Sequence, residues 1–223
     1  MKLLEMSFRD LYKQCVILKG TNALSVATDI LKECSYTLAP LWDAVLCYCY
    51  IDSDAGMSFH FLCLADFENG EVDFDSYEKL LSEKKALIYR YDEEYEIRSY
   101  LGDTSVFLER VRMVDKGYHG NEQVLPTRNI SVIDHLRYGR HPDDIQALLR
   151  KNCLQIEQVW VRLTGIEDGN LVGTLLNEPN NDFGIHRGNV VHVQVTKGGG
   201  KVYAVCLLEE NKITSLDQPL LEG

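Results

Sequence analysis

The residues best suited to acid–base or metal chemistry gather in a short stretch around two histidines. His135 and His141 are accompanied by Asp134, Asp143 and Asp144. A histidine beside a carboxylate can act as a general base or a metal ligand, because its pKa lies near neutral pH. The same residues also fit the start of a helix, where acids in the first turn are favoured. We interpret 141–152 as such a helix, capped by its acids, and assign it no catalytic role.

Three cysteines and a histidine form a second candidate, a metal centre. Cys47 and Cys49 would share one face of a strand, and a hairpin partner could bring Cys63 near them. His60 lies three residues from Cys63, so strand alternation predicts that it faces the opposite side. The tetrahedron of a zinc site would then lack a fourth ligand. We therefore interpret the cysteines as small buried hydrophobic residues and predict no metal.

The motifs that mark common catalytic centres are missing from the sequence. It contains no Gly-x-Ser-x-Gly, no HExxH and no dinucleotide-binding fingerprint. The segment 198–201, Gly-Gly-Gly-Lys, lacks the spacer and hydroxyl residue of a phosphate-binding loop and fits a hairpin turn. We predict no catalytic residue and no cofactor.

The charge of the chain is strongly negative and unevenly distributed. The net charge is −11, and the segment 66–98 alone holds eleven acids against five bases. This distribution disfavours nucleic acid, whose binding depends on neutralising phosphates with Lys and Arg. It permits a basic protein partner, and it also fits a solvated face that keeps the protein soluble.

Tyrosines and acids alternate at the end of this acidic segment. Tyr91, Glu93, Glu94 and Tyr95 follow one another closely, and tyrosine is enriched in protein interfaces. We predict that these four residues belong to a binding surface, although such tyrosines also commonly line an amphipathic sheet.

The elements that would position these residues suggest two parts. In the N-terminal part, helical spacing predicts a helix at 23–38, and two apolar runs at 42–51 and 57–65 predict a hairpin. A short helix at 73–84, capped by Asp73 or Asp75, a strand at 87–91 and a helix at 97–112 follow.

The C-terminal part reads as a β-meander. Strands are predicted at 156–163, 171–176, 190–195 and 201–208, separated by turns rich in Gly, Asn and Asp. The expected class is α+β: an N-terminal antiparallel sheet with flanking helices, then a small antiparallel meander or partly open barrel. The expected divisions are an N-terminal domain (1–115), a loop and helix connection (116–152) and a small β domain (153–223).

Within the meander, the segments 157–163, 168–179 and 185–191 resemble the YegJ-like family of small bacterial domains of unknown function. The match rests on a Gly-x-Leu-x-Asn-x-Pro sequence at 173–179 and on the Gly-Asn-Val-Val sequence at 188–191, where Asn189 replaces the family's usual Asp. The family's closing segment is absent. The resemblance implies a bacterial cytosolic protein with a small β domain, and it carries over no catalytic residue.

The loop between the second and third strands of the meander is the second predicted binding region. It contains Asn177, Glu178, Asp182, His186 and Arg187. Polar loops held by a rigid scaffold are common places for binding residues.

Taken together, these patterns favour a non-enzymatic protein-interaction module with a basic protein partner, of which an immunity-like protein is one specific form. The alternative is an enzyme or small-ligand-binding protein with a pocket between the two parts, using His135, His141 and His186. No membrane association is predicted, because the longest apolar window, at 44–51, is too short to span a bilayer. With no apolar start resembling a signal peptide, we expect a cytoplasmic protein.

Overall fold

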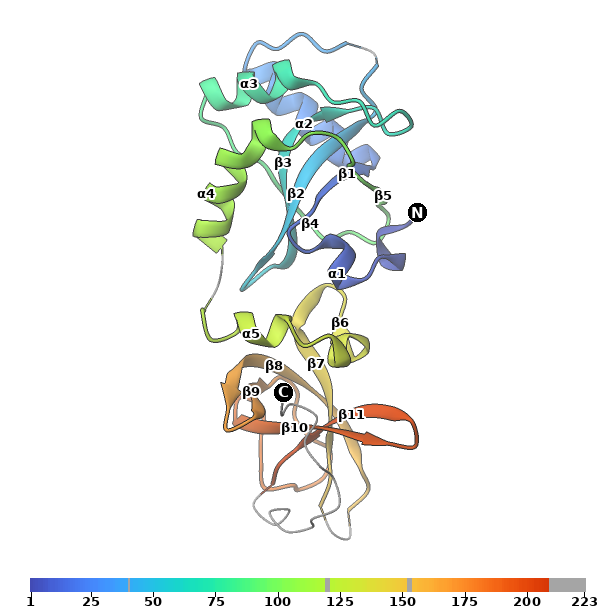
Figure 1. Ribbon diagram of the computed structural model, residues 1–223, viewed down its shortest axis with the longest axis vertical. Coiled ribbons are helices and arrows are strands. Elements are labelled where there is room, and N and C mark those ends of the chain that lie inside the picture. The colour runs from blue at the N-terminus through green and yellow to red at the C-terminus, as the bar shows by residue number, and fades with distance from the viewer. Residues whose placement is uncertain (40, 119–120, 152–153, 209–223) are drawn as a thin grey trace. The chain divides into compact units, whose positions relative to one another are not determined.

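The computed structural model describes all residues of the chain except 40, 119–120, 152–153 and 209–223. Two sheets, each with its own apolar core, account for the strands (Figure 1). The predicted α+β class, a helix-flanked antiparallel sheet followed by a small β-barrel, is confirmed. Among the described residues, no helix is long and apolar enough to cross a membrane.

The first unit, Met1–His119, is organised around a five-stranded antiparallel sheet. Its strands are, in chain order, β1 (Cys15–Lys19), β2 (Ala44–Asp52), β3 (Gly56–Ala65), β4 (Ile88–Arg90) and β5 (Glu96–Ser99). Across the sheet they follow the order β4-β3-β2-β1-β5, so the long hairpin β2–β3 lies inside it. The predicted hairpin is confirmed, and Gly56 at its turn has a φ of 77°, which glycine adopts without steric cost.

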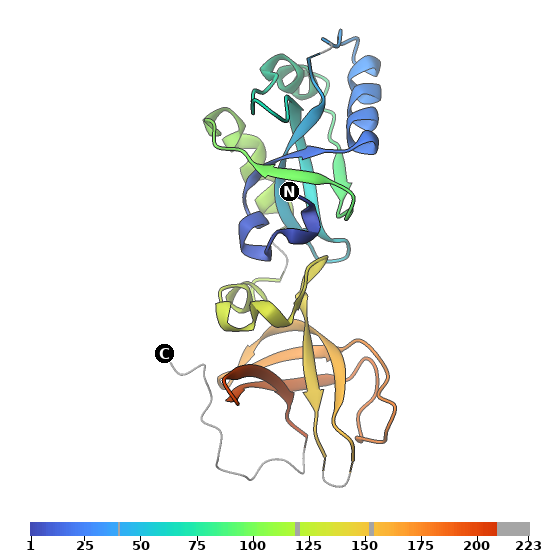
Figure 2. The same cartoon turned by 90° about the vertical axis from the view of Figure 1, so that its right-hand side faces the viewer.

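Helices cover both faces of this sheet. One apolar cluster joins the sheet to η1 (Leu3–Glu5), α1 (Phe8–Leu11) and α2 (Thr21–Glu33). The cluster on the opposite face includes residues of η2 (Ser105–Phe107) and α4 (Leu108–Tyr118). Figure 2 shows α2 and α4 on opposite sides of the strands. The central strands are therefore buried on both faces, which explains their nearly continuous apolar sequences.

Helix α3 (Phe74–Ser82) begins where the sequence predicted. Asp73 is its N-cap, and its side chain accepts a hydrogen bond from the backbone N–H of Ser76. The Ser76 hydroxyl in turn accepts a hydrogen bond from the N–H of Leu64 in β3. The cap thus also ties the start of the helix to the sheet.

Two elements of the first unit differ from the prediction. The helix expected at 97–112 is wrong in its first half, because β5 pairs with β1 there and helix α4 begins only at Leu108. Strand β1 itself was not predicted, since its apolar run is short. β1 pairs with both β2 and β5, and a short sequence pattern cannot reveal such pairing.

The second unit, Gly120–Gly223, is a five-stranded mixed barrel with a short additional strand. Its strands are β6 (Arg137–Tyr138), β7 (His141–Leu149), β8 (Glu157–Glu167), β9 (Asn170–Leu175), β10 (Val190–Gly198) and β11 (Lys201–Cys206). The four predicted meander strands are confirmed as β8 to β11. The parallel pairing of β11 with β7 closes the barrel. Two short helices, α5 (Leu125–Arg128) and η3 (Ser131–Leu136), precede the barrel strands.

The helix predicted at 141–152 is wrong, because this segment forms strand β7; its predicted end, at Asn152, lies outside the described residues. The acids that suggested a helix start are used differently. Asp143 accepts two hydrogen bonds from Arg128, and Asp144 accepts two from Arg162 of the neighbouring strand. These paired, largely buried carboxylates replace the expected cap.

A β-bulge changes which cysteines face each other. Leu46 pairs with Cys63, but the next residue, Cys47, pairs with Phe61, so β3 holds one extra residue. Cys47 and Cys49 therefore lie in the cluster on the α2 face, whereas Cys63 lies in the cluster on the α4 face.

The bulge also overturns the alternation argument about the histidine. His60 is directly opposite Tyr48, which belongs to the α4 face, so His60 and Cys63 share that face. Among the described residues, no group of three or more His, Cys, Asp or Glu could hold a metal ion.

Candidate functional site

The first unit has a pocket at the start of α2, here called the α2 pocket. Its volume is about 740 Å³. Its lining comes from the β1–α2 junction, from Asp43 before β2, and from the segment that leads into β5. The side chains that line it are Lys19, Thr21, Asn22, Leu24, Ser25, Thr28, Asp43, Asp92, Glu94, Tyr95 and Glu96, together with Gly20.

The pocket depends partly on Gly20, which follows the end of β1 and has no side chain. A Cβ at this position would lie 2.7 Å from Cδ1 of Tyr95, so only glycine allows the tyrosine ring to pack against the backbone. Tyr95 is itself 4% exposed. Its ring therefore forms a rigid wall, and the chain on either side of it carries the acids.

A single ion pair lies within the α2 pocket. The Lys19 ammonium donates a 2.6 Å hydrogen bond to Asp43, which also accepts from the backbone N–H of Phe67. Burial alone would raise the Asp43 pKa, but Lys19 and Phe67 together hold it below its usual value. The bond to Asp43 in turn raises the pKa of Lys19. Both groups are charged at neutral pH.

The remaining charges of the pocket are carboxylates. Asp92 is half-buried and its side chain accepts a hydrogen bond from the N–H of Glu94, while Glu94 and Glu96 are exposed. Lys2 lies 3.8 Å from the Glu94 carboxylate, an exposed ion pair of the kind that contributes little. The pocket thus presents four carboxylates against the single ammonium of Lys19.

The four predicted binding residues of this region occupy different environments. Glu94 and Tyr95 line the α2 pocket, and Glu93 is exposed beside them. Tyr91 is half-buried and packs against the core on the α2 face. Both tyrosines contribute to the apolar core, so neither presents a freely exposed aromatic ring.

The second predicted region, the loop after β9, is held by a carboxylate of β8 and by carboxylates of its own. Glu157 of β8 accepts hydrogen bonds from the backbone N–H groups of Asn180, at 2.7 Å, and Asn181, at 2.8 Å. Asn177 is half-buried and accepts a 2.7 Å bond from the N–H of Trp160, which extends the ladder beyond the end of β9. Asp182 accepts a bond from the N–H of Gly184 within the loop. These groups are engaged in shaping the loop.

Glu178 and His186 form an exposed ion pair in the same loop. The Nδ1 atom of His186 lies 2.6 Å from the Glu178 carboxylate, whose other oxygen accepts from the N–H of Arg187. The bond to Glu178 raises the His186 pKa, and the same bond lowers the Glu178 pKa. The structure brings these three predicted residues together. Because the pair is open to solvent, it is not held in the dry, shaped cavity that acid–base catalysis favours.

The other two histidines do not join this pair in a common site. His135 Nε2 lies 3.1 Å from the carbonyl oxygen of Val202 and helps hold η3 against β11. His141 stacks on Tyr138, with ring centroids 6.1 Å apart, and burial lowers its pKa. Among the described residues, these contacts join each histidine to a different part of the chain, and none of them links two of the three histidines.

Several residues of the α2 pocket were not predicted. Lys19 ends β1, and Asp43 precedes β2 and lies 24 positions further along the chain, so only their 2.6 Å contact relates them. Asp92 and Glu96 belong to the acidic segment and could have been included from charge alone. The comparisons with known proteins add no constraint, because the chain matches no family model, no curated protein and no solved structure.

Proposed function

We propose that the protein is a non-enzymatic, cytosolic bacterial interaction module, whose N-terminal unit binds a basic protein partner at the α2 pocket. The observation that carries this proposal is the concave surface with four carboxylates around one ammonium. Lysine and arginine side chains of a partner would complement it, because opposite charge speeds encounter and fixes orientation.

The distribution of charge over the chain supports the same surface. Residues 1–119 contain 21 acids and 13 bases, whereas residues 120–208 contain nine of each. The excess of negative charge in the described chain therefore belongs to the first unit. Of the eleven acids at 66–98, eight are exposed, and only Asp66, Asp73 and Asp92 are not.

The buried and half-buried acids of this segment have structural tasks. Asp66 accepts hydrogen bonds from the N–H groups of Glu68 and Asn69, and Asp73 caps α3. The exposed acids near the pocket, such as Glu94 and Glu96, have no comparable task in the turns. Their charge is available to a partner. Because other acids of the segment hold the turns, binding is the better explanation for these exposed ones.

An immunity-like protein is one specific form of this function. Such a protein would cover a basic site on a toxin, for example a nuclease, with its acidic surface. Exposed charge pairs contribute about 0.2–1 kcal/mol each, so affinity would also require apolar contacts and would fall as salt rises. The half-buried Leu24 of the pocket lining and the methylene groups around the pocket would supply part of those contacts.

The test is recovery of a partner from the native host with the intact chain as bait, at low and at high salt. We expect a basic protein that is retained at low salt and released as salt increases. A Glu94→Gln, Glu96→Gln double variant should weaken binding of that protein about two- to thirtyfold, since two exposed charges of this kind amount to about 0.4–2 kcal/mol.

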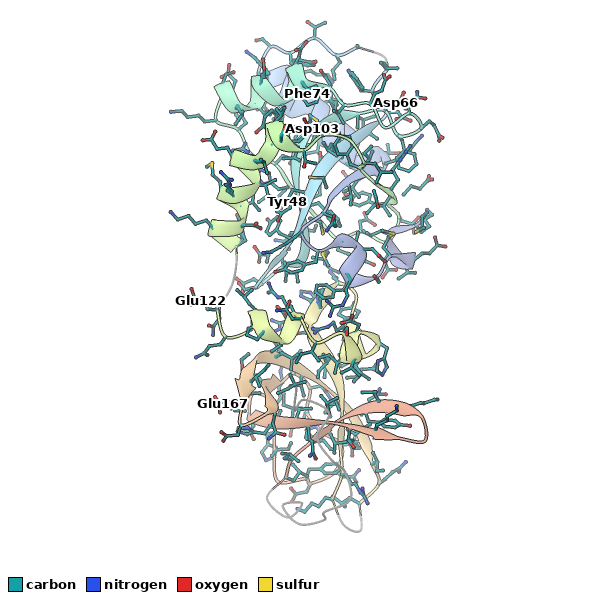
Figure 3. The ribbon with its side chains drawn as sticks, in the orientation of Figure 1. Tyr48, Asp66, Phe74, Asp103, Glu122 and Glu167 are labelled. Atoms are coloured by element: carbon teal, nitrogen blue, oxygen red, sulfur yellow. The ribbon has the colours of Figure 1, made fainter. Side chains whose placement is uncertain are left out.

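The matched control is Glu167→Gln. This residue is also exposed, and it lies in the β8–β9 hairpin of the second unit (labelled in Figure 3). It should leave the affinity unchanged. Recovery of the bait alone at low salt, or equal weakening by the control and the double variant, would remove the proposal.

A further inference from the structure

Helix α4 covers a polar stripe of the sheet. Tyr48 and Tyr50 of β2 lie on the α4 face, and His60 of β3 is directly opposite Tyr48. Tyr48 is labelled in Figure 3, on β2, and Figure 1 shows α4 alongside these strands. A sheet face that packs against a helix is ordinarily apolar, so this stripe is an unusual surface to bury.

The histidine in this stripe has no partner for its polar atoms. His60 is 5% exposed, and neither ring nitrogen has a hydrogen-bond partner among the described residues. A buried polar group without a partner is costly, and a buried charge without one is more costly still. The packing of α4 on the sheet therefore requires His60 to be neutral.

The charged groups around His60 do not relieve this requirement. From α4, the Arg110 guanidinium opposes a second positive charge, and it is held by a hydrogen bond from its Nη2 to the carbonyl oxygen of Lys85. Asp115 of α4 already accepts a 2.7 Å bond from the Tyr48 hydroxyl. In β4, Arg90 is directly opposite Ser58, which shares the sheet face of His60, so Arg90 adds a further positive charge on that face.

Two cysteines and several tyrosines also face this stripe, and thiols and phenols with ordinary pKa values carry no charge at pH 5 to 7. They are Cys15, Cys63, Tyr50, Tyr77 and Tyr118. Burial, and then Arg110, lower the His60 pKa to about 4. While α4 is packed on the sheet, here called the closed state, His60 is therefore neutral at neutral pH.

Helix α4 is otherwise weakly attached to the sheet. Val114 is its single fully buried residue, Met113 is 59% exposed, and Gly117 lies within its last turn. Glycine inside a helix costs about 1 kcal/mol relative to alanine. Its other attachments include the Tyr48–Asp115 bond, the packing of Tyr118 on Tyr50, the half-buried Val111 and the bond from Arg110 to the Lys85 carbonyl.

We propose that α4 is an acid-releasable cover, and that protonation of His60 detaches it from the sheet while the strands remain folded. Release would hydrate the His60 imidazolium and expose the polar stripe of β2 and β3. The device is independent of the α2 pocket, which lies on the other elements of this unit.

The test is amide hydrogen exchange of the full chain at pH 7 and pH 5, expressed as protection factors so that the intrinsic pH dependence is removed. Protection of α4 should be lower than that of β2 at pH 7, because α4 opens without the sheet. Between pH 7 and pH 5, a pKa near 6.5 in the open state and about 4 in the closed state predicts a further loss of about 20-fold.

Two variants complete the test. His60→Leu removes the titrating group, so the protection of α4 should become nearly independent of pH. Tyr48→Phe removes one hydrogen bond to α4, so protection should fall about fivefold at both pH values while the ratio between them is kept.

Equal protection of α4 and β2 at both pH values would overturn the proposal, since α4 would then open only when the whole unit unfolds. This comparison uses the wild-type chain alone, so it decides even if His60→Leu does not fold. Persistence of the 20-fold loss in a folded His60→Leu variant would also overturn it, because another group would then control release.

Discussion

Gly173 in β9 offers a direct test of how tightly the second unit is packed. A Cβ atom at this position would lie 2.5 Å from the carbonyl oxygen of Arg162 and 2.6 Å from Cγ1 of Val161. Both atoms belong to the adjacent strand β8, and the first is backbone, which cannot rotate away. Gly173→Ala therefore forces the two strands apart locally.

The expected magnitude combines two opposing effects. Overpacking of this kind costs about 1–3 kcal/mol. Replacing glycine with alanine also restricts the unfolded chain, which returns about 0.4–1 kcal/mol where the native backbone is compatible. The net loss in the free energy of unfolding is about 1–2 kcal/mol, or roughly 5–15 °C in Tm for a unit of this size.

The assay is thermal unfolding followed by circular dichroism, with Gly198→Ala as the matched control. Gly198 ends β10 in the same barrel, and a Cβ there would lie 3.7 Å from Tyr203, an ordinary contact. We expect the control to unfold within about 2 °C of the wild type, as a surface substitution usually does. If Gly173→Ala had the same Tm as the control, the β8–β9 contact would accommodate a Cβ more easily than the distances imply, and the prediction would be refuted.

Two further predictions concern the cap of α3 and the exposed ion pair. Asp73→Ala removes both the α3 cap and the acceptor of the Tyr36 hydroxyl, so urea unfolding should show a free energy of unfolding lower by about 1–2 kcal/mol. The control Asp75→Ala, at an exposed neighbouring position, should change it by less than about 0.5 kcal/mol. Equal losses in the two variants would contradict the capping role. Glu178→Gln should lower the His186 pKa toward its usual value in an NMR titration, because the bond to Glu178 is what raises it. The His186 pKa is raised and the Glu178 pKa is lowered, so the ion pair stabilises the loop at pH values between the two. This contribution is lost as the pH rises through the His186 pKa or falls through the Glu178 pKa. An unchanged His186 titration in the variant would contradict this coupling.

Local patterns were enough to predict the strands that pair with their sequence neighbours. The β2–β3 hairpin and the meander from β8 to β11 have turn residues between alternating or apolar runs, and each strand pairs with the one before it. Asp73 was also identifiable, because a cap acts on the backbone of the next three residues. In these cases the sequence and the stabilising contact lie within the same short segment.

The elements that sequence reasoning missed depend on partners far along the chain. β7 resembles a helix start, but Arg128 and Arg162 bind its two acids, and its parallel contact with β11 joins Leu148 to Val205. β5 lies beside β1, some 80 residues earlier in the chain. No local propensity encodes such pairings, so tertiary contacts decided the outcome.

The negative charge of the candidate site could be predicted from the sequence, but the shape of its pocket could not. The acidic segment pointed to Glu94, and Glu96 lies within the same run of charge. The pocket itself depends on Gly20, whose missing side chain admits the Tyr95 ring, and on the contact between Lys19 and Asp43. Those relations join residues more than 20 positions apart, and the sequence shows none of them.

The two units use their carboxylates in different ways, and this difference is the strongest reason to locate binding in the first. In the second unit, Asp143, Asp144, Glu157 and Glu178 each hold an arginine, a histidine or a loop backbone. A partner that competed for them would have to break contacts that shape the barrel and its loop. The exposed acids around the α2 pocket hold no element of the fold in this way. A basic partner can therefore contact them without breaking structural contacts, which keeps the free-energy cost of binding low.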